Sequence, residues 1–174
     1  MPFVVHALLD GLMKQKASLV LDADGLNIFA TFDDKPKLSE RCVMTPHPKE
    51  LSRLLNVSVE EIQKNRIDAA RDASKRFGTV VLLKGHRTVV ANGNEFRIND
   101  TGCSALAKAG SGDCLTGIIA GLLAQKVEPF DAAVFGAKIH GIAGELAAKK
   151  LSDYGVLASD LPRYIAKAML QLQH

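Results

Sequence analysis

Three short, uninterrupted hydrophobic runs stand out in the first half of the chain: Ser18–Asp22, Arg41–Thr45 and Val80–Lys84. None of them alternates between apolar and polar positions, which is typical of strands buried on both faces of a parallel sheet. We expect a loop at Asp24–Asn27 after the first of these strands. The pattern therefore predicts a sheet core with its polar residues at the strand ends.

Helical periodicity fills most of the remaining chain. Between the second and third strands it forms one long pattern, in which Ser58 and Glu61 have the spacing of a capping box and Gly78 marks the end. Strand, helix and strand in this order predict a βαβ unit. Further helices are expected over Pro2–Gln15, Asp113–Gln125, Pro129–Lys150 and Leu161–Gln171. The second of these is apolar all round, so we expect it to be buried.

A β-hairpin is predicted between the third strand and the helical C-terminal half. Its strands are Thr88–Ala91 and Glu95–Ile98, and Asn92-Gly93 between them is a strong type I′ turn signal. The whole succession predicts an α/β fold. Ligands in such folds bind beyond the carboxyl ends of the strands, so candidate functional residues are sought there.

Composition narrows the function without deciding it. The 174 residues suit a single domain, 1–174, and carry a net charge of +3 with Lys and Arg spread along the chain. With only 5% aromatic residues, a nucleic-acid partner is not expected. The mild positive charge fits an anionic small molecule and equally fits an ordinary surface.

Cysteine usage and hydropathy bear on the compartment. Cys42, Cys103 and Cys114 are odd in number and lack CxxC spacing, which argues against a disulfide framework or a zinc site and favours a reducing, cytoplasmic compartment. No stretch of 18 apolar residues and no signal peptide is apparent, so no membrane partner is expected.

The segment Gly110-Ser111-Gly112-Asp113 carries the sharpest chemical signal. Its glycines allow close approach of a ligand, and the helix that follows presents free N–H groups and a positive dipole end to an anion. A carboxylate at this position can accept a hydroxyl proton during phosphoryl transfer. The segment is not a Walker A loop, because Ile118 follows Gly117. An aspartate in a first helical turn is also a common helix-start residue, so this segment alone leaves both interpretations open.

Other candidates lie at the strand ends. Lys84 can pair with a phosphate, and His47 is held between two prolines. Asp22 and Asp24 can bind a ligand, or Mg²⁺ through water. Each of these residues equally suits a structural role at a strand end or loop. His140, on a helix rich in small residues, is expected to be a core or helix-surface residue.

Taken together, the motifs resemble one family. Their order resembles the NAD(P)H-hydrate dehydratase family of the ribokinase-like superfamily: Leu21-Asp22-Ala23-Asp24-Gly25-Leu26-Asn27, then Thr45-Pro46-His47-Pro48-Lys49-Glu50, then Lys84-Gly85-x-x-Thr88, then Gly110-Ser111-Gly112-Asp113. The resemblance implies a three-layer α/β/α fold, with a mostly parallel sheet and helices on both faces.

The resemblance also implies a chemistry. Members use ADP or ATP to phosphorylate the ring hydroxyl of hydrated NADH or NADPH, after which phosphate leaves, and Mg²⁺ is expected to bridge the nucleotide phosphates. Asp113 would be the catalytic base and would contact the hydrate together with His47, Asp24 and Asn27. The metal ligands are not assigned. The nucleotide would be held by Lys84, Gly85, His86, Arg87, Thr88, Gly110, Ser111 and Gly112.

The sequence departs from the family pattern in places. Cys103 stands where the family usually has Asn, and Lys108 where it usually has Thr. Family domains also extend further at the N-terminus, so we expect an N-terminally truncated fold whose Asp22 strand has an exposed edge. Homo-oligomerisation is one way to complete such a sheet.

Two alternatives to the dehydratase stay open. One is a kinase of the same superfamily acting on a sugar, hydroxymethylpyrimidine or thiazole alcohol. The other is an inactive nucleotide-binding fragment. The Thr-Pro-His-Pro-x-Glu segment favours the dehydratase.

Overall fold

A computed structural model of the chain describes residues 2–15 and 17–173. Its centre is a five-stranded sheet with the order β1 (Leu19–Leu21), β2 (Cys42–Met44), β3 (Val80–Leu83), β4 (Val89–Asn92) and β5 (Glu95–Ile98). The first three strands are parallel, and β4 and β5 continue the sheet as an antiparallel hairpin. The parallel part therefore brings the carboxyl ends of three strands to one edge.

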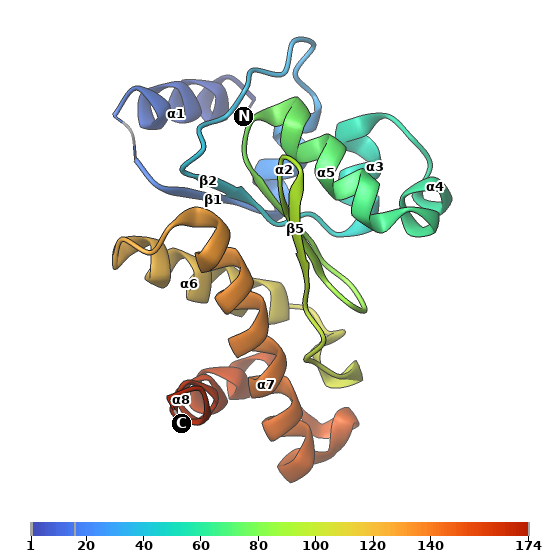
Figure 1. The fold of residues 1–174 in the computed structure, drawn as a ribbon, viewed down its shortest axis with the longest axis vertical. Coiled ribbons are helices and arrows are strands. Elements are labelled where there is room, and N and C mark those ends of the chain that lie inside the picture. Colours follow the sequence, from blue (N-terminus) through green and yellow to red (C-terminus); the bar gives the residue numbers. More distant parts are fainter. Residues whose placement is uncertain (1, 16, 174) are drawn as a thin grey trace.

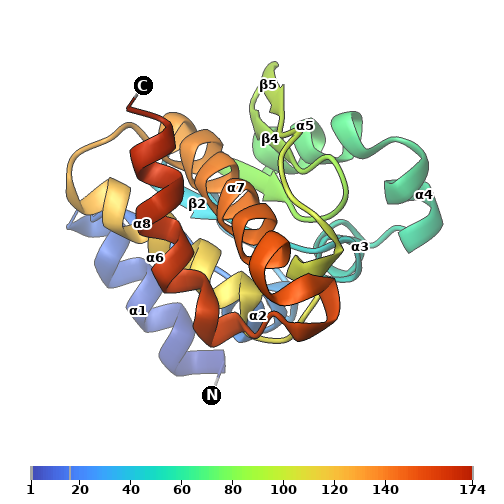
Figure 2. The same ribbon diagram turned by 90° about the horizontal axis from the view of Figure 1, so that it is seen from below.

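Helices cover both faces of this sheet, which confirms the predicted three-layer α/β/α fold (Figures 1 and 2). The helices that share a core with one face are α1 (Pro2–Lys14), α2 (Ala23–Ala30), α3 (Pro48–Leu55), α4 (Val59–Lys64) and α5 (Arg66–Phe77). The other face packs against α6 (Ser111–Ala124) and α7 (Pro129–Gly155), and α8 (Leu161–Gln171) lies on α7.

Strands β2 and β3 bury both of their faces, as their uninterrupted hydrophobic runs predicted, whereas β1 is partly buried and β5 is mostly exposed. In β3, Val81 and Leu83 point into the core under α2, α3 and α5, whereas Val80 and Leu82 point toward α6 and α7. Successive side chains of a strand face opposite sides, so two buried faces require every position to be apolar. In the first core, Phe29 packs edge to face on Phe77 with ring centroids 5.6 Å apart.

Two sequence-based expectations about local structure were wrong. Asp24–Asn27 is not a loop but part of α2, which begins because Asp22 Oδ1 accepts a hydrogen bond from the Ala23 amide at 2.8 Å. The long helical pattern after β2 is divided into α3, α4 and α5. Asn56 ends α3 in the left-handed conformation, with φ of 59°, a shape that Asn adopts more readily than most residues.

Three further features differ in detail. Ser58 caps α4 by accepting from the Glu61 amide, but the reciprocal half of a capping box is absent there. The hairpin loop is Gly93–Asn94, and only Gly93 has positive φ (61°), which matches a type II′ turn and not type I′. Helix α6 is buried along one face only, through Ser111, Leu115, Ile119 and Leu123.

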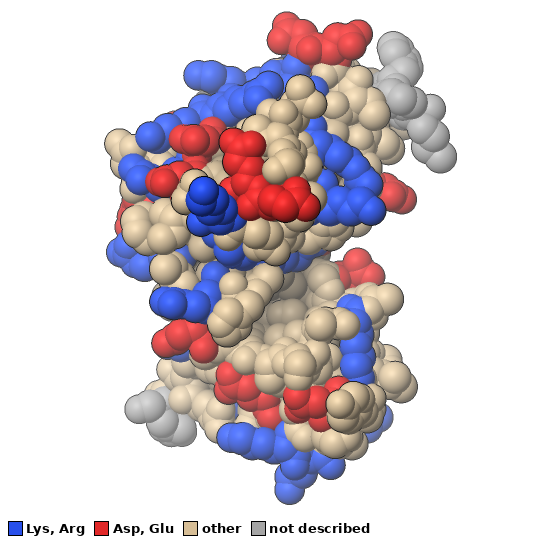
Figure 3. Space-filling view, turned by 90° about the vertical axis from the view of Figure 1, so that its right-hand side faces the viewer, with Lys and Arg blue, Asp and Glu red and all other residues tan. Residues whose placement is uncertain are grey.

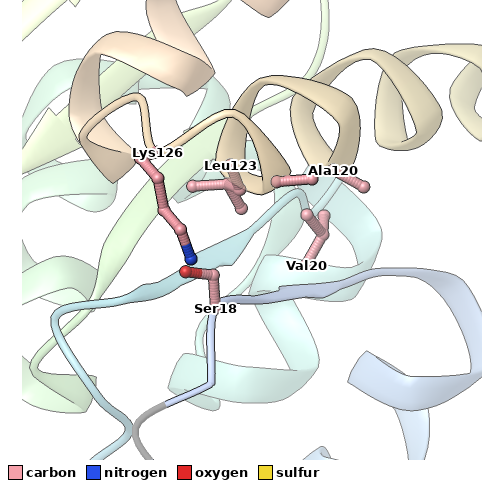
Figure 4. A pocket seen from close by; sticks show the side chains of 6 residues that line it. Ser18, Val20, Ala120, Leu123 and Lys126 are labelled. Atoms are coloured by element: carbon pink, nitrogen blue, oxygen red, sulfur yellow. The ribbon is translucent and has the colours of Figure 1, made fainter.

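The outer edge of β1 carries no strand within the described residues, as expected. A cavity of about 260 Å³ lies between this edge and α6, with Lys126 and Ser18 pointing toward each other across it (Figure 4). The expected self-association through this edge stays a prediction.

Charges of both signs are interspersed over the surface in Figure 3, which also shows a hollow across the middle of that face. Within residues 2–15 and 17–173, no helix is both long and apolar enough to cross a membrane.

Helix α7 is packed unusually close to the loop that follows the hairpin. A methyl group added at Gly141 would lie 2.1 Å from Thr101 Oγ1, and one added at Gly144 would lie 2.5 Å from Leu106 Cγ. Thr101 Oγ1 also donates to the Lys138 carbonyl oxygen at 3.2 Å. Glycine is therefore required at these two positions by close approach of the loop.

We predict that Gly141→Ala lowers the free energy of unfolding by about 1–3 kcal/mol, because the added methyl overpacks a tight contact. Urea denaturation measures the change. Gly121→Ala is the matched control: its added methyl meets nothing within 4 Å, so helix propensity should stabilise it by up to about 1 kcal/mol. Equal stability of the two variants would contradict the packing argument.

Candidate functional site

A cavity of about 490 Å³ lies at the carboxyl end of β3, between the loop after that strand, the start of α6 and the middle of α7. It includes seven of the eight residues predicted to hold a nucleotide. Gly110 is not among the lining residues, which are Lys84, Gly85, His86, Arg87, Thr88, Asn99, Thr101, Gly102, Cys103, Ser104, Leu106, Ala107, Ser111, Gly112, Leu115, Ala137, His140 and Gly141.

The start of α6 has no side-chain cap. Gly110 is the N-cap residue, with φ of 84°, and provides no side chain to accept hydrogen bonds from the first turn. Amide groups at an uncapped helix start are available to a ligand, and the helix dipole favours a negative one. Gly110 also lies so close to Ala158 that an added methyl would be 3.0 Å from the Ala158 Cβ. Both the positive φ and the lack of space beside Ala158 favour glycine at position 110.

A network of charged groups connects the strand ends to α6. Lys84 Nζ lies 2.6 Å from Asp22 Oδ1 and 3.8 Å from Glu50 Oε2. The second carboxylate oxygen of Asp22 accepts from Thr116 Oγ1 at 2.9 Å. A methyl added at Gly112 would lie 3.7 Å from Lys84 Nζ, so the ammonium group sits beside the start of α6.

Burial strengthens this network. The Glu50 and Asp22 side chains are 5% and 10% exposed, and that of Lys84 is 21% exposed. Charges with little access to water interact strongly and need partners. Two carboxylates share one ammonium here, so the Lys84 ammonium is fixed in position at the cavity.

His47 performs a structural task at this edge. Its Nδ1 accepts from the amides of Lys49 and Glu50, both at 3.1 Å, while Glu50 Oε2 accepts from the His47 amide at 2.8 Å. This reciprocal capping box begins α3 and places the Glu50 carboxylate next to Lys84. Because Nδ1 accepts, a neutral ring carries its hydrogen on Nε2, 3.4 Å from Glu50 Oε1.

None of the four residues predicted to contact substrate is among the residues that line the cavity. His47 is coupled to Lys84 through Glu50, and Asp113 lies exposed in the first turn of α6. Asp24 is exposed on the first turn of α2, and Asn27 Oδ1 accepts from Arg53 Nη1 at 2.6 Å. Substrate contact by these four residues stays a prediction.

Sequence reasoning missed Arg66, which fixes the end of β3. Its Nη2 donates to the carbonyl oxygens of Leu83 and Lys84 at 3.0 and 3.2 Å, and partial burial lowers the pKa of its guanidinium. Gly85 follows with φ of 143°, leaving room for Arg66. An arginine opening a helix gives no sequence signal for this role, because it follows from the packing of α5 on β3.

A second missed feature anchors the loop before α6. Lys108 Nζ donates to the carbonyl oxygens of Tyr154 and Val156 at 2.8 and 2.5 Å, which ties this loop to the end of α7. The nearby Cys103 and Cys114 are not activated thiols, because burial raises the pKa of both. Lys108 therefore anchors the loop before α6 to the end of α7.

A third missed residue is His140. Its Nε2 lies 3.1 Å from Ser111 Oγ, and both side chains line the cavity. Burial lowers the pKa of His140 to about 4. Its place on α7, on a face shared with Gly136, Gly141 and Gly144, was the available signal, because small residues mark a helix face that something approaches closely.

Residues 4–167 match the NAD(P)H-hydrate dehydratase family. The chain belongs to this family. It is 42% identical over 160 residues to the ADP-dependent (S)-NAD(P)H-hydrate dehydratase of Neisseria meningitidis, and the match covers 90% of this chain and 53% of that protein. The chain thus spans about half the length of this relative.

Solved structures agree with the family and with the fold. The ADP/ATP-dependent NAD(P)H-hydrate dehydratase of Bacillus subtilis, co-crystallised with ATP/Mg²⁺, superposes with a TM-score of 0.84 at 32% identity, covering 93% of this chain and 57% of that one. A ribokinase-like superfamily protein from Enterococcus faecalis superposes with a TM-score of 0.78 at 30% identity, covering 96% and 58%. The fold is therefore ribokinase-like, as predicted.

We predict that protonation of His140 destabilises the fold in acid. The pKa of this group is about 4 when folded and 6.5 in its unperturbed state, so the unfolded chain takes up the proton first. The free energy of unfolding should fall as the pH drops from about 6.5 to 4, by an amount on the order of 3 kcal/mol. Urea denaturation of the wild type and of His140→Gln across this pH range isolates the contribution of His140 to the free energy of unfolding. Equal losses of stability in both proteins would contradict the prediction.

Proposed function

We propose that this chain catalyses the nucleotide-dependent dehydration of hydrated NADH or NADPH. The terminal phosphoryl group of ADP or ATP is transferred to the ring hydroxyl of the hydrate. Phosphate then leaves with the electron pair of its carbon–oxygen bond, and loss of a proton from the neighbouring ring carbon restores the double bond. NADH or NADPH, inorganic phosphate and AMP or ADP are the products.

The observation that carries the proposal is the juxtaposition of the α6 start with Lys84. The Gly112 amide, which no side chain caps, and the Lys84 ammonium lie at the same cavity, whereas the Ser111 amide donates to the Lys108 carbonyl oxygen at 3.2 Å. Phosphoryl transfer requires donors placed in advance around the transferring group, and these groups supply them without reorganisation. Membership of the family and the ADP-dependent and ATP-bound relatives support the same reaction.

In this proposal Asp113 is the general base. It lies in the first turn of α6, two residues after Ser111, and is exposed to the solvent from which a substrate arrives. Its carboxylate takes the proton of the substrate hydroxyl as the oxygen attacks phosphorus and the bond to the bridging oxygen of the nucleotide breaks.

Magnesium fits this site as a companion of the nucleotide. Among the described residues there is no group of three or more His, Cys, Asp or Glu side chains that could hold a metal ion. Mg²⁺ in nucleotide sites commonly uses one or two carboxylates and takes its other ligands from phosphates and water. Asp22 and Glu50, the buried carboxylates nearest the cavity, are already paired with Lys84, so the ion would take its ligands mainly from phosphates and water and would neutralise phosphate charge.

The direct test is product analysis. Purified protein is incubated with hydrated NADH, Mg²⁺ and either ADP or ATP, and the products are identified by mass spectrometry. We expect NADH, inorganic phosphate and the shortened nucleotide. A stable phosphorylated alcohol formed from another substrate, with no dehydration, would indicate a kinase and overturn the proposal.

We predict that Asp113→Asn lowers the turnover number by about 10²–10⁴, because the general base is lost. Asparagine keeps the size of the side chain, so Mg²⁺-nucleotide affinity should stay close to that of the wild type. Initial rates of NADH formation and calorimetric titration with nucleotide measure the two effects. Wild-type turnover in this variant would show that Asp113 is not the base.

We predict that Gly112→Ala weakens Mg²⁺-ADP binding about tenfold or more, because its methyl group enters the space beside Lys84 and Asp22. The same methyl makes only ordinary contacts in the free protein, so folding should be unimpaired. Gly117→Ala, on the same helix with nothing within 4 Å of its added methyl, is the matched control and should bind normally. Equal affinities would place the nucleotide elsewhere.

A further inference from the structure

His140 connects α7 to the start of the neighbouring helix α6 through one hydrogen bond. Its Nε2 is 3.1 Å from the hydroxyl oxygen of Ser111, the first residue of α6. The two residues are 9% and 3% exposed, and both line the cavity. A buried pair at this position can control how the Ser111 hydroxyl faces a bound phosphate.

The hydrogen bond between His140 and Ser111 has two possible arrangements, which differ in whether His140 Nε2 carries a hydrogen. Burial lowers the pKa of His140 to about 4, so near pH 7 the ring is neutral, with one N–H group and one unprotonated nitrogen. If Nε2 is unprotonated, the Ser111 hydroxyl donates to it, and Ser111 offers only lone pairs to the cavity. If Nε2 carries the hydrogen, it donates to Ser111 Oγ, and the hydroxyl proton is free to bind an anion.

We infer that His140 is a positioning residue of the phosphate site: its Nε2–H donates to Ser111 Oγ and thereby directs the Ser111 hydroxyl proton to a phosphate oxygen of the nucleotide. The inference rests on the proposed nucleotide-dependent function. Only this arrangement adds a donor to those supplied by the helix amides and Lys84, and the other would place an acceptor against a phosphate.

The surroundings hold the imidazole in place. The neighbouring Gly141 lies against Thr101, so close that no side chain fits between them. One turn further, Glu145 Oε1 accepts from the Gly102 amide at 2.6 Å. These contacts fix α7 against the loop that lines the cavity. The ring therefore has a defined position from which to orient Ser111.

A double-mutant cycle tests whether His140 acts through Ser111. Calorimetry measures the Kd of Mg²⁺-ADP and Mg²⁺-ATP for His140→Phe, Ser111→Ala and the double variant. We expect each single substitution to weaken binding roughly tenfold, and the double variant to bind no more weakly than Ser111→Ala. Lys149→Ala, an exposed change on the same helix, is the control and should bind as the wild type does.

A spectroscopic measurement on the wild type needs no variant. Long-range ¹H–¹⁵N correlation spectra distinguish the two neutral tautomers of His140, and we expect hydrogen on Nε2 with and without nucleotide.

His140→Gln, which retains an N–H donor, should recover most of the affinity lost in His140→Phe.

The possible outcomes distinguish a failure of the proposed function from a failure of the role assigned to His140. If the wild type binds no nucleotide, the proposed function fails and this inference fails with it. If the wild type binds nucleotide but the cycle is additive, or hydrogen resides on Nδ1, the inference alone is overturned. If His140→Phe does not fold, the tautomer and His140→Gln decide the matter.

Discussion

The site depends on the ion pair between Lys84 and Asp22 at the ends of two parallel strands that are not neighbours in the sheet. Parallel pairing with β2 brings both strand ends to one edge, and the 2.6 Å contact ties β1 to β3 across it. Glu50 reaches the same ammonium from α3, and Thr116 binds Asp22 from α6. A cation and a helix N-terminus are thus fixed side by side where few waters compete, which is what recognition of a phosphate requires.

The start of α6 and the loop before it are held from two directions. Toward the sheet, Gly112 rests beside the Lys84 ammonium. Toward the helical layer, Lys108 binds the end of α7 and Ser111 contacts His140. Rigid support from both layers keeps the donors in place before a ligand arrives, so binding energy is not spent on ordering them. The close glycine contacts of α7 serve the same end, because they fix the layer that carries His140.

Much of this architecture followed from the sequence, because strands buried on both faces need apolar residues at every position and short loops need particular residues. Five strands and the late helices were predicted, and the position of the anion site stays a prediction. The helix at Ala23–Ala30 was not, because its signal is an aspartate cap with Leu26 and Phe29 buried, in a stretch too short to show a period. Arg66, Lys108 and His140 were missed or undervalued, since each acts through contacts far away in the sequence.

In the proposed function, nucleotide phosphate binds at the start of α6 beside Lys84. Backbone ¹H–¹⁵N spectra recorded during titration with Mg²⁺-ADP test it most directly, because each amide reports on its own surroundings. We expect saturable shifts that are largest for Gly110–Asp113 and for the residues after β3, with smaller shifts on the outer helices. Binding that leaves those amides unchanged and perturbs another surface, or no binding at all, would contradict it.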